Sequence, residues 1–553
     1  MGLVERRIGL LFVAFFAFLS FAGLRAAYLG AVKAPGLRDA AASQQVAVVK
    51  VPARRGTVTD RHGVDLAVSE PADDVTANPM LIKDAPGVAR RLAPILGVPA
   101  DELLAKLAER ERGFVYLKRL LPSSRARRVE KLEIEGIDLI SSSRRIYPQR
   151  YLASQLLGNV GIDGAGLSGL EYSRDKVLRG REGERRLVRD ALGDPISLRD
   201  ERSMRSGADV QLTIDAAIQD RVEKVLAGVG EKFRPRGATA MVMDPRTGEV
   251  LALANWPRVD ANDLEEAPDY ARQDRAVGAA YEPGSTFKPF TVAGALEEKL
   301  VAPDTVFELP AEITVADRTI GEAHPLTSST LTTADILAQS SNVGAVTIGL
   351  RLGERRFDRW VRRFGFGRTT GVDLPGEGTG IVPDVEDYSG STIGNAPIGQ
   401  GLAVTPMQMA TAYAAIANGG ILRPARVVRA VDGEPVPAPR GRRILSRVTA
   451  ASVRTMLEGV FAEGGTAEKV SIPGYELAGK TGTANKPDPA TGGYSDTKYV
   501  ASVVGFAPAR DPRLLVTVMV DEPQGEYYGG IVAAPAFQEI ATFALPYLRI
   551  APE

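Results

Sequence analysis

The pattern of hydrophobic positions separates one long apolar run from the rest of the chain. Ile8 to Leu24 is uncharged and almost entirely apolar. Its 17 residues would form a helix of roughly 26 Å, close to the minimum needed to cross a membrane. Farther along, apolar positions come only in shorter runs that alternate with polar turns. This pattern predicts a single membrane-spanning helix followed by a large globular part.

The charges beside the apolar run predict its orientation. Arg6 and Arg7 precede it, and positive residues stay on the cytoplasmic side. We therefore expect a cytoplasmic tail at 1–7, a membrane anchor at 8–24, a small-residue-rich linker at 25–50, and everything later outside the cytoplasm. A cleaved signal peptide is the alternative, but the run is long and no small-x-small cleavage site follows it directly.

Residues 51–206 are Arg-rich and of mixed pattern, and we expect them to form a first exported domain. "RRGTVTDRHGVDLAVS" predicts two short strands around a turn, and "DELLAKLAERER" predicts a charged amphipathic helix. Gly158 to Gly169 contains five glycines, which suggests unusual backbone angles or close chain approach. It also contains G-x-x-G-x-x-G, but without the strand–helix context of a dinucleotide site.

Residues 207–553 have the pattern of an α+β domain. "ATAMVMDPRTGEVLALANWP" and "KYVASVVGFAPARDPRLLVTVMVDEP" each have two apolar runs around turn residues, which is typical of a hairpin. Helical patterns lie between them, including "TVAGALEEKL", "TTADILAQSSNVGAVTIGLRLG" and "TPMQMATAYAAIANGG". Hairpins at both ends with helices between predict one antiparallel sheet flanked by helices.

Composition narrows the possible chemistry. Lys and Arg together equal Asp and Glu at 68 each, so no global charge favours nucleic acid. The chain has no cysteine, which excludes thiolate catalysis and cysteine-based metal sites. Its two histidines, His62 and His324, lie in turn-like and loop-like stretches that predict surface positions. We therefore expect a general base other than imidazole.

"GYELAGKTGTANKPDP" allows two incompatible interpretations. It fits G-x-x-x-x-G-K-[ST], the phosphate-binding loop of nucleotide hydrolases. Such a loop needs a helix starting at its lysine, but the glycines and prolines after Lys480 predict none. An exported protein also has no ATP available. The alternative is that Lys480, Thr481, Gly482 and Thr483 lie on a strand that forms one wall of a serine acyl-transferase site.

Two other segments supply the rest of such a site. In "YEPGSTFKPF", Ser285 opens a predicted helix and Lys288 follows three residues later, on the same face. A neutral lysine could accept the serine proton. In "AQSSNVG", Ser340 could relay a proton, and Asn342 could bind a substrate amide and Lys288. We expect the charge of Lys480 to lower the pKa of Lys288, and Gly482 to leave room for substrate backbone.

These motifs closely resemble the S-x-x-K, S-x-N and K-T-G set of the penicillin-binding proteins. The likeness narrows to the class B, monofunctional transpeptidases, and covers nearly the whole chain. Three stretches resemble motifs of their non-catalytic pedestal domain and the entry to their transpeptidase domain: "RRGTVTDRHGVDLA", "RRIYPQRYLASQLLGNVGIDGAGLSGLE" and "DVQLTIDAAIQ". The resemblance implies a penicillin-binding, β-lactamase-like transpeptidase fold at 207–553, carried on an elongated pedestal at 51–206.

The resemblance also implies residue roles. Ser285 would be acylated, Lys288 would be its base, and Ser340 would protonate the leaving amine. Asn342 would bind the substrate, and Lys480, Thr481 and Thr483 would hold the substrate carboxylate. The backbone N–H groups of Ser285 and Thr483 would form the oxyanion hole.

The function implied is cross-linking of peptidoglycan stem peptides, with inhibition by β-lactams and no cofactor or metal. A septal, FtsI-like role is favoured over elongation. Since no glycosyltransferase domain is expected, a SEDS-type polymerase and other divisome membrane proteins are the implied partners. We expect the pedestal and anchor to dock that polymerase, with a plain spacer as the alternative. A carboxypeptidase or β-lactamase and a non-catalytic β-lactam-binding scaffold are the remaining alternatives.

Overall fold

The computed structural model describes residues 2–30, 46–189, 195–326, 328–488 and 492–553. Helix α1 (Gly2–Tyr28) contains the predicted anchor and extends several residues beyond both of its ends. Its segment Arg6–Tyr28 is long and apolar enough to cross a membrane, with a mean hydropathy of 2.1. The helix therefore includes most of the predicted cytoplasmic tail.

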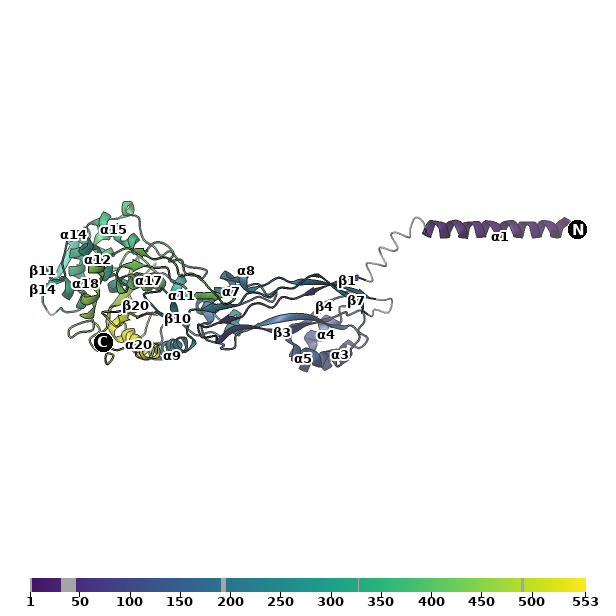
Figure 1. The fold of residues 1–553 in the computed structure, drawn as a ribbon, viewed down its shortest axis with the longest axis horizontal. Helices are drawn as coiled ribbons and strands as arrows, with labels where there is room; N and C mark the ends of the chain where they lie inside the picture. Colours follow the sequence, from purple (N-terminus) through teal and green to yellow (C-terminus); the bar gives the residue numbers. More distant parts are fainter. Residues whose placement is uncertain (1, 31–45, 190–194, 327, 489–491) are drawn as a thin grey trace.

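The domain that follows the N-terminal helix is built around long antiparallel strands (Figure 1). As predicted, β2 (Val58–Thr59) and β3 (Asp65–Ala77) flank a turn, but β3 is long and also pairs with β4 (Val115–Pro122) and β5 (Ile137–Ile146). Helices α3 (Ala85–Leu96), α4 (Ala100–Leu107) and α5 (Ser123–Glu130) surround a small core of their own with these strands. The predicted charged helix is α4, which ends before the Glu-Arg repeat. The remaining elements are the short helices α6 (Ser154–Leu157), α7 (Gly169–Ser173) and α8 (Asp175–Leu178), and the sheet β1 (Val46–Val51), β6 (Gly183–Arg189) and β7 (Pro195–Arg202).

Buried ion pairs join the Arg-rich opening motif, which contains Arg55, to the later glycine-rich motif, which contains Arg145 and Glu171. Arg55 donates to Glu171 at 2.6 Å and to Asp175 at 2.6 Å, and Arg145 donates to the other Glu171 oxygen at 2.7 Å. Glu171 is completely buried. Since a buried carboxylate needs such partners, this network explains why the Arg-rich opening motif and the glycine-rich segment come together.

This domain and the C-terminal domain share a sheet. In it, β8 (Val210–Leu212) pairs with β2 on one side and with β16 (Val428–Val431) on the other. One hydrophobic core also extends across the junction, from Leu66 and Leu152 into the C-terminal domain. Strand β1 begins at Val46, inside the predicted 25–50 linker. The domains are therefore continuous in their packing.

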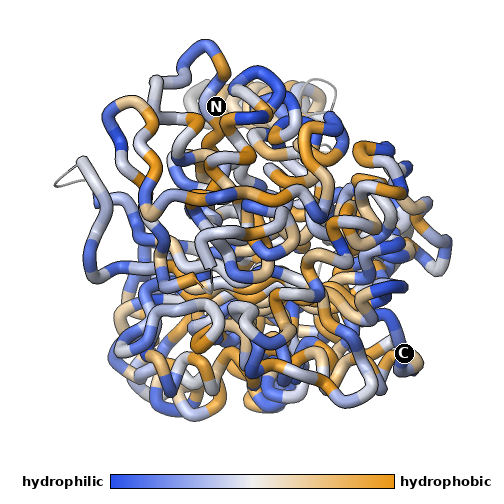
Figure 2. Tube along the Cα trace, turned by 90° about the vertical axis from the view of Figure 1, so that its left-hand side faces the viewer, coloured by the Kyte–Doolittle hydropathy of each residue, from blue (hydrophilic) through white to orange (hydrophobic). Residues whose placement is uncertain are grey.

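The C-terminal domain has the predicted α+β architecture. Its antiparallel sheet has the order β10-β9-β21-β20-β19, and both predicted hairpins form. The strands are β9 (Gly237–Met243), β10 (Val250–Trp256), β19 (Ala478–Asp488), β20 (Gly493–Ala507) and β21 (Leu514–Asp521). Helices α9 (Ala216–Phe233) and α20 (Ala534–Tyr547) cover one face, and α17 (Pro406–Ala417) and α18 (Arg447–Glu458) cover the other (Figure 1). Viewed along the long axis, many projecting loops are hydrophilic, whereas hydrophobic segments run through the middle (Figure 2).

One predicted helix proves to be two. The stretch from Thr333 forms α13 (Thr333–Ala338) and α14 (Asn342–Leu352), with a break at Gln339–Ser341. Ser340 has a φ of 62°, which an α-helix cannot accommodate. The break therefore lies at the S-x-N motif.

The other helices and strands of this domain lie mainly around the sheet. They are η2 (Ala261–Glu266), α10 (Asp269–Arg272), α11 (Arg275–Gly278), η3 (Gly284–Phe287), α12 (Lys288–Glu297), β11 (Val306–Glu308), β12 (Glu312–Val315), β13 (Arg318–Gly321), β14 (Thr330–Thr332), α15 (Glu354–Arg363), η4 (Val385–Asp387), α16 (Thr392–Asn395), η5 (Ala396–Ile398), β15 (Ile421–Leu422), β17 (Glu434–Pro435), β18 (Arg442–Arg443) and α19 (Gly529–Val532).

Candidate active site

Ser285 and Lys288 lie at the start of a buried helix. Ser285 is in the 3-10 turn η3, and Lys288 is the first residue of α12, which follows without a gap. Ser285 is half-buried and lines a cavity, whereas Lys288 has no exposed surface. The predicted helix-opening position of Ser285 is therefore correct.

The ammonium group of Lys288 meets the second motif directly. Its Nζ donates to the Ser340 carbonyl at 2.5 Å and to Asn342 Oδ1 at 2.7 Å, and lies 3.2 Å from Ser340 Oγ. The αL conformation of Ser340 turns both its carbonyl and its hydroxyl toward the lysine. The amine of Lys288 thereby joins two residues that lie 52 and 54 positions later in the sequence.

Burial lowers the pKa of Lys288 to about 7. Desolvation is the main cause, because it penalises the charged form, and the negative charge of Glu322 partly opposes it. The expected repulsion between the two lysines is present, but burial and not Lys480 is the main cause of the shift of Lys288. Burial first, and the charge of Lys288 second, hold the pKa of Lys480 well below its usual range.

The third motif lies on β19, at the edge of the sheet. Lys480 is completely buried, and its Nζ donates to the Thr481 carbonyl at 3.2 Å. Lys480 is in the middle of a strand, so the helix that a phosphate loop requires does not follow it. Within the described residues β19 pairs with β20 alone, so its other edge is available to the cavity.

Gly482 has a different structural reason from the one expected. A Cβ at this position would lie 2.9 Å from Thr286 Cγ2, 3.0 Å from the Pro283 carbonyl oxygen and 2.7 Å from Ser502 Oγ. The glycine therefore allows β19 to approach the turn that carries Ser285. Gly482 also lines the cavity, so the expectation that it leaves room for substrate backbone stays a prediction.

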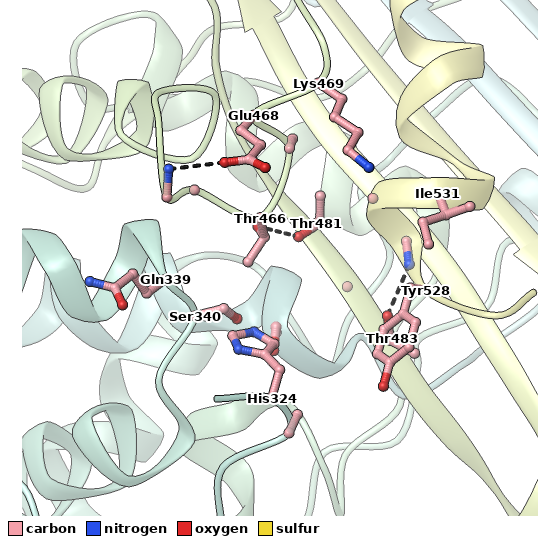
Figure 3. A pocket seen from close by; sticks show the side chains of 18 of the residues that line it. His324, Gln339, Ser340, Thr466, Glu468, Lys469, Thr481, Thr483, Tyr528 and Ile531 are labelled. Carbon is pink, nitrogen blue, oxygen red and sulfur yellow. Dashed lines mark hydrogen bonds between the residues drawn. The ribbon is translucent and has the colours of Figure 1, made fainter. Parts of the chain in front are cut away.

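The three motifs border one cavity of about 450 Å³ (Figure 3). Ser285 and Ser340 line it together with Thr481, Gly482 and Thr483. Thr481 and Thr466 share a hydrogen bond of 2.6 Å between their hydroxyl oxygens, and Thr483 Oγ1 accepts from the Gly529 amide at 3.0 Å. Lys288, Asn342 and Lys480 lie behind this surface. Such a cavity offers a serine, a buried amine and a strand edge to a peptide-like substrate.

Comparison with known proteins identifies the fold and the motifs together. Residues 238–542 match the penicillin binding protein transpeptidase domain, and residues 50–212 match the penicillin-binding protein dimerisation domain. The chain is a class B penicillin-binding protein. It is 35% identical to the peptidoglycan D,D-transpeptidase FtsI of Escherichia coli, over 97% of this chain and 90% of the relative. It is 34% identical to the penicillin-binding protein PbpB of Mycolicibacterium smegmatis, over 96% and 89%.

Solved structures of the same kind superpose on most of this penicillin-binding protein. Penicillin binding protein 3 of Mycobacterium tuberculosis, complexed with aztreonam, has a TM-score of 0.71 at 30% identity, over 91% of this chain and 98% of that one. A peptidoglycan synthetase from Bifidobacterium adolescentis has a TM-score of 0.73 at 30% identity, over 92% and 98%.

Glu322 is a site residue that the sequence analysis missed. In this class B penicillin-binding protein, its carboxylate accepts from the Asn342 amide at 2.6 Å, the Ser341 hydroxyl at 2.6 Å and the Val343 amide at 3.2 Å. It thus satisfies the free amides at the start of α14 while attracting the charge of Lys288. Its position after a short strand, 20 residues before Asn342, carries no recognisable motif.

The two histidines differ in position. His324 lies in a partly exposed loop, as predicted, and also lines the cavity, where Figure 3 shows it beside Ser340. His62 is largely exposed, with Nε2 3.0 Å from Asp215 Oδ2 across the domain junction. Among the residues that the structure describes, no group of three His, Asp or Glu side chains is placed to hold a metal ion.

Proposed function

We propose that this penicillin-binding protein cross-links peptidoglycan as a D,D-transpeptidase through an acyl-enzyme on Ser285. One observation carries the assignment: the buried Lys288 amine contacts Ser340 and Asn342 behind a cavity that Ser285 and the Lys480–Thr483 strand also border. A lysine with a pKa near 7 is a base at neutral pH. This arrangement supports a nucleophile with its own base.

Acylation would proceed in these steps. Ser285 Oγ attacks the carbonyl carbon of the penultimate D-alanine while Lys288 Nζ takes the hydroxyl proton. The oxyanion of the tetrahedral intermediate is held by the backbone N–H groups of Ser285 and Thr483. The C–N bond to the terminal D-alanine then breaks, and a proton passes through Ser340 from Lys288 to the leaving amine.

The third motif would bind the terminal carboxylate. Thr481 and Thr483 present hydroxyl groups to the cavity, and Lys480 lies directly behind them. An arriving carboxylate favours the charged form of Lys480 and so offsets the burial that lowers its pKa. In the second half-reaction an amine of a neighbouring stem attacks the ester carbonyl, and Ser285 Oγ leaves.

The setting of the reaction belongs to the same proposal. Helix α1 anchors the chain in the inner membrane with the catalytic domain outside the cytoplasm, since Arg6 and Arg7 precede the apolar run. The similarity to FtsI favours a septal role. A SEDS-type polymerase and other divisome proteins remain predicted partners, and the domain boundaries at 50/51 and 206/207 remain predictions.

Intact-mass measurement on the full chain tests the assignment. Excess benzylpenicillin should add one adduct to the wild type and none to Ser285→Ala. A full adduct on the mutant would contradict the role of Ser285. With a D-Ala-D-Ala-ended stem peptide, released D-alanine should be matched by cross-linked product when an acceptor amine is present. Release matched only by free acid would assign a carboxypeptidase instead.

A further inference from the structure

Two further cavities lie away from the catalytic one, and arginine side chains line both of them. One, of about 430 Å³, is lined by Arg246, Arg423, Arg454 and Arg510. The other, of about 310 Å³, is lined by Arg368, Arg423, Arg440 and Arg442. Arg423 is common to both, and neither shares a lining residue with the catalytic cavity.

Five separate segments bring these arginines together, including α18 with Arg454 and the loop after α15 with Arg368. The β9–β10 turn supplies Arg246, the β20–β21 turn supplies Arg510, and the β15–β18 region supplies Arg423 and Arg442. The chain as a whole is electrically balanced. A gathering of seven arginines with one lining carboxylate, Asp511, is therefore a local separation of charge.

Some of these guanidinium groups have partners: Arg246 is paired with Asp511, Arg442 donates to the Arg363 carbonyl at 3.0 Å, and Arg454 donates to the Ile416 carbonyl at 3.4 Å. Asp511 and Glu458 also lie close enough to Arg454 to act on its charge. Within the described part of the chain, the side chains of Arg368, Arg423 and Arg440 form no hydrogen bond or ion pair. Elsewhere in the molecule, arginines such as Arg55 and Arg145 are held by carboxylates.

Two observations show that the positive charge is only partly compensated inside the protein. The Nε atoms of Arg423 and Arg454 are buried and without a hydrogen-bond partner. Burial, followed by the charges of Arg368 and Arg363, lowers the pKa of Arg442, with no carboxylate opposing it. Since unpartnered buried donors and facing like charges both destabilise a protein, an external anion would relieve both.

We propose that the two joined cavities bind a ligand with at least two phosphate groups. Guanidinium groups donate two parallel hydrogen bonds to phosphate oxygens, and the shared Arg423 lets one ligand reach both cavities. A protein partner would need an apolar anchor, and no large, exposed hydrophobic residue lines either cavity. A free oligophosphate and a phosphodiester polymer both offer the required chemistry.

Calorimetric titration of the full chain in detergent with sodium tripolyphosphate, at constant ionic strength, tests the site. We expect one saturable site, weakened by about tenfold or more in Arg423→Gln and in Arg454→Gln, which both line the larger cavity. The control is Arg447→Gln, an exposed α18 residue outside both cavities. It removes the same charge and should bind as the wild type does.

The outcomes separate the alternatives. Equal weakening in all three variants would reduce the effect to general attraction and overturn the site. Hexaglutamate binding as tightly as tripolyphosphate would overturn the phosphate assignment. Displacement of tripolyphosphate by a glycerol phosphate hexamer would identify a phosphodiester chain as the source, and failure to displace it would identify a compact oligophosphate. Penicillin acylation should be unchanged in Arg423→Gln, which separates this site from the proposed transpeptidase chemistry.

Discussion

At the scale of single residues, the chemistry depends on how burial changes the pKa of one amine, that of Lys288. Lys288 has no exposed surface and contacts only neutral acceptors through its Nζ. Desolvation therefore exceeds the attraction of Glu322 and lowers the pKa to about 7. The lysine can then be neutral and accept a proton at the pH at which it works.

This pKa predicts a pH dependence of acylation. The rate constant for benzylpenicillin acylation should be low at pH 5.5, rise through pH 7 as Lys288 loses its proton, and level off above pH 8. Stopped-flow measurements across this range give the midpoint. Lys288→Ala should lose on the order of 10²-fold or more at the plateau. A wild-type rate that is flat from pH 5.5 to 9 would contradict the role of Lys288 as base.

Glu322 should act as a positioning residue on the same amine. Glu322→Gln keeps the shape but removes the charge that raises the pKa of Lys288. The midpoint of the acylation profile should move to lower pH. The plateau should fall about tenfold, because charge-assisted hydrogen bonds to Ser341 and Asn342 are weakened. A fall in plateau with an unmoved midpoint would leave Glu322 with only a structural role in α14.

The sequence predicted the residue identities better than their reasons. Ser285, Lys288, Ser340, Asn342 and the Lys480–Thr483 strand all fall where the motifs suggested, because short fixed spacings carry that information. Glu322 and His324 reach the site from a loop with no motif, and only tertiary packing brings them there. Burial as the main cause of the low pKa of Lys288 was not predicted, since burial cannot be read from spacing.

At the scale of secondary-structure elements, the site depends on a close contact between β19 and η3. Both hairpins and the flanking helices were predictable, because apolar alternation and turn residues are local signals. The break between α13 and α14 was not, because Thr333 to Leu352 has a continuous helical pattern. Ser340 leaves the helix to meet Lys288, a contact between distant segments.

The contact at Gly482 can be tested by adding one methyl group. Gly482→Ala places a Cβ against Thr286, Pro283 and Ser502, so β19 and η3 must separate by several tenths of an ångström. We expect about 1–3 kcal/mol of lost unfolding free energy and slower acylation, measured by thermal denaturation and by penicillin labelling. Gly113→Ala is the control, because its Cβ meets nothing within 4 Å, and should change neither. Native acylation in Gly482→Ala would show that the contact does not position Ser285.

At the scale of the whole molecule, the domain between helix α1 and the catalytic domain contains two different cores. One cluster, including Leu103, is enclosed by α3, α4, α5 and the far part of the β3–β4–β5 sheet. Residues near the junction, including Leu66, belong instead to the large core of the catalytic domain. The sequence pattern changes at Gly207, but the packing is continuous there, because β8 pairs with strands from both domains.

This division predicts opposite consequences for two matched substitutions. Leu66 and Leu103 are both fully buried, so truncation to alanine should cost each about 2–5 kcal/mol. In Leu103→Ala the outer core, which is the cluster that includes Leu103, should unfold at a lower temperature, while penicillin acylation should persist up to the same temperature as in the wild type. In Leu66→Ala penicillin acylation should be lost at a lower temperature, because the core around Leu66 continues beneath the catalytic sheet. The comparison requires scanning calorimetry alongside fluorescent-penicillin labelling after heating in steps.

If Leu103→Ala reduced labelling as much as Leu66→Ala, the two domains after helix α1 would unfold as one cooperative unit. The outer core could then not rearrange on a partner without affecting catalysis. If only Leu66→Ala did so, the outer core would be free to serve as a docking module while the junction holds the active site in place.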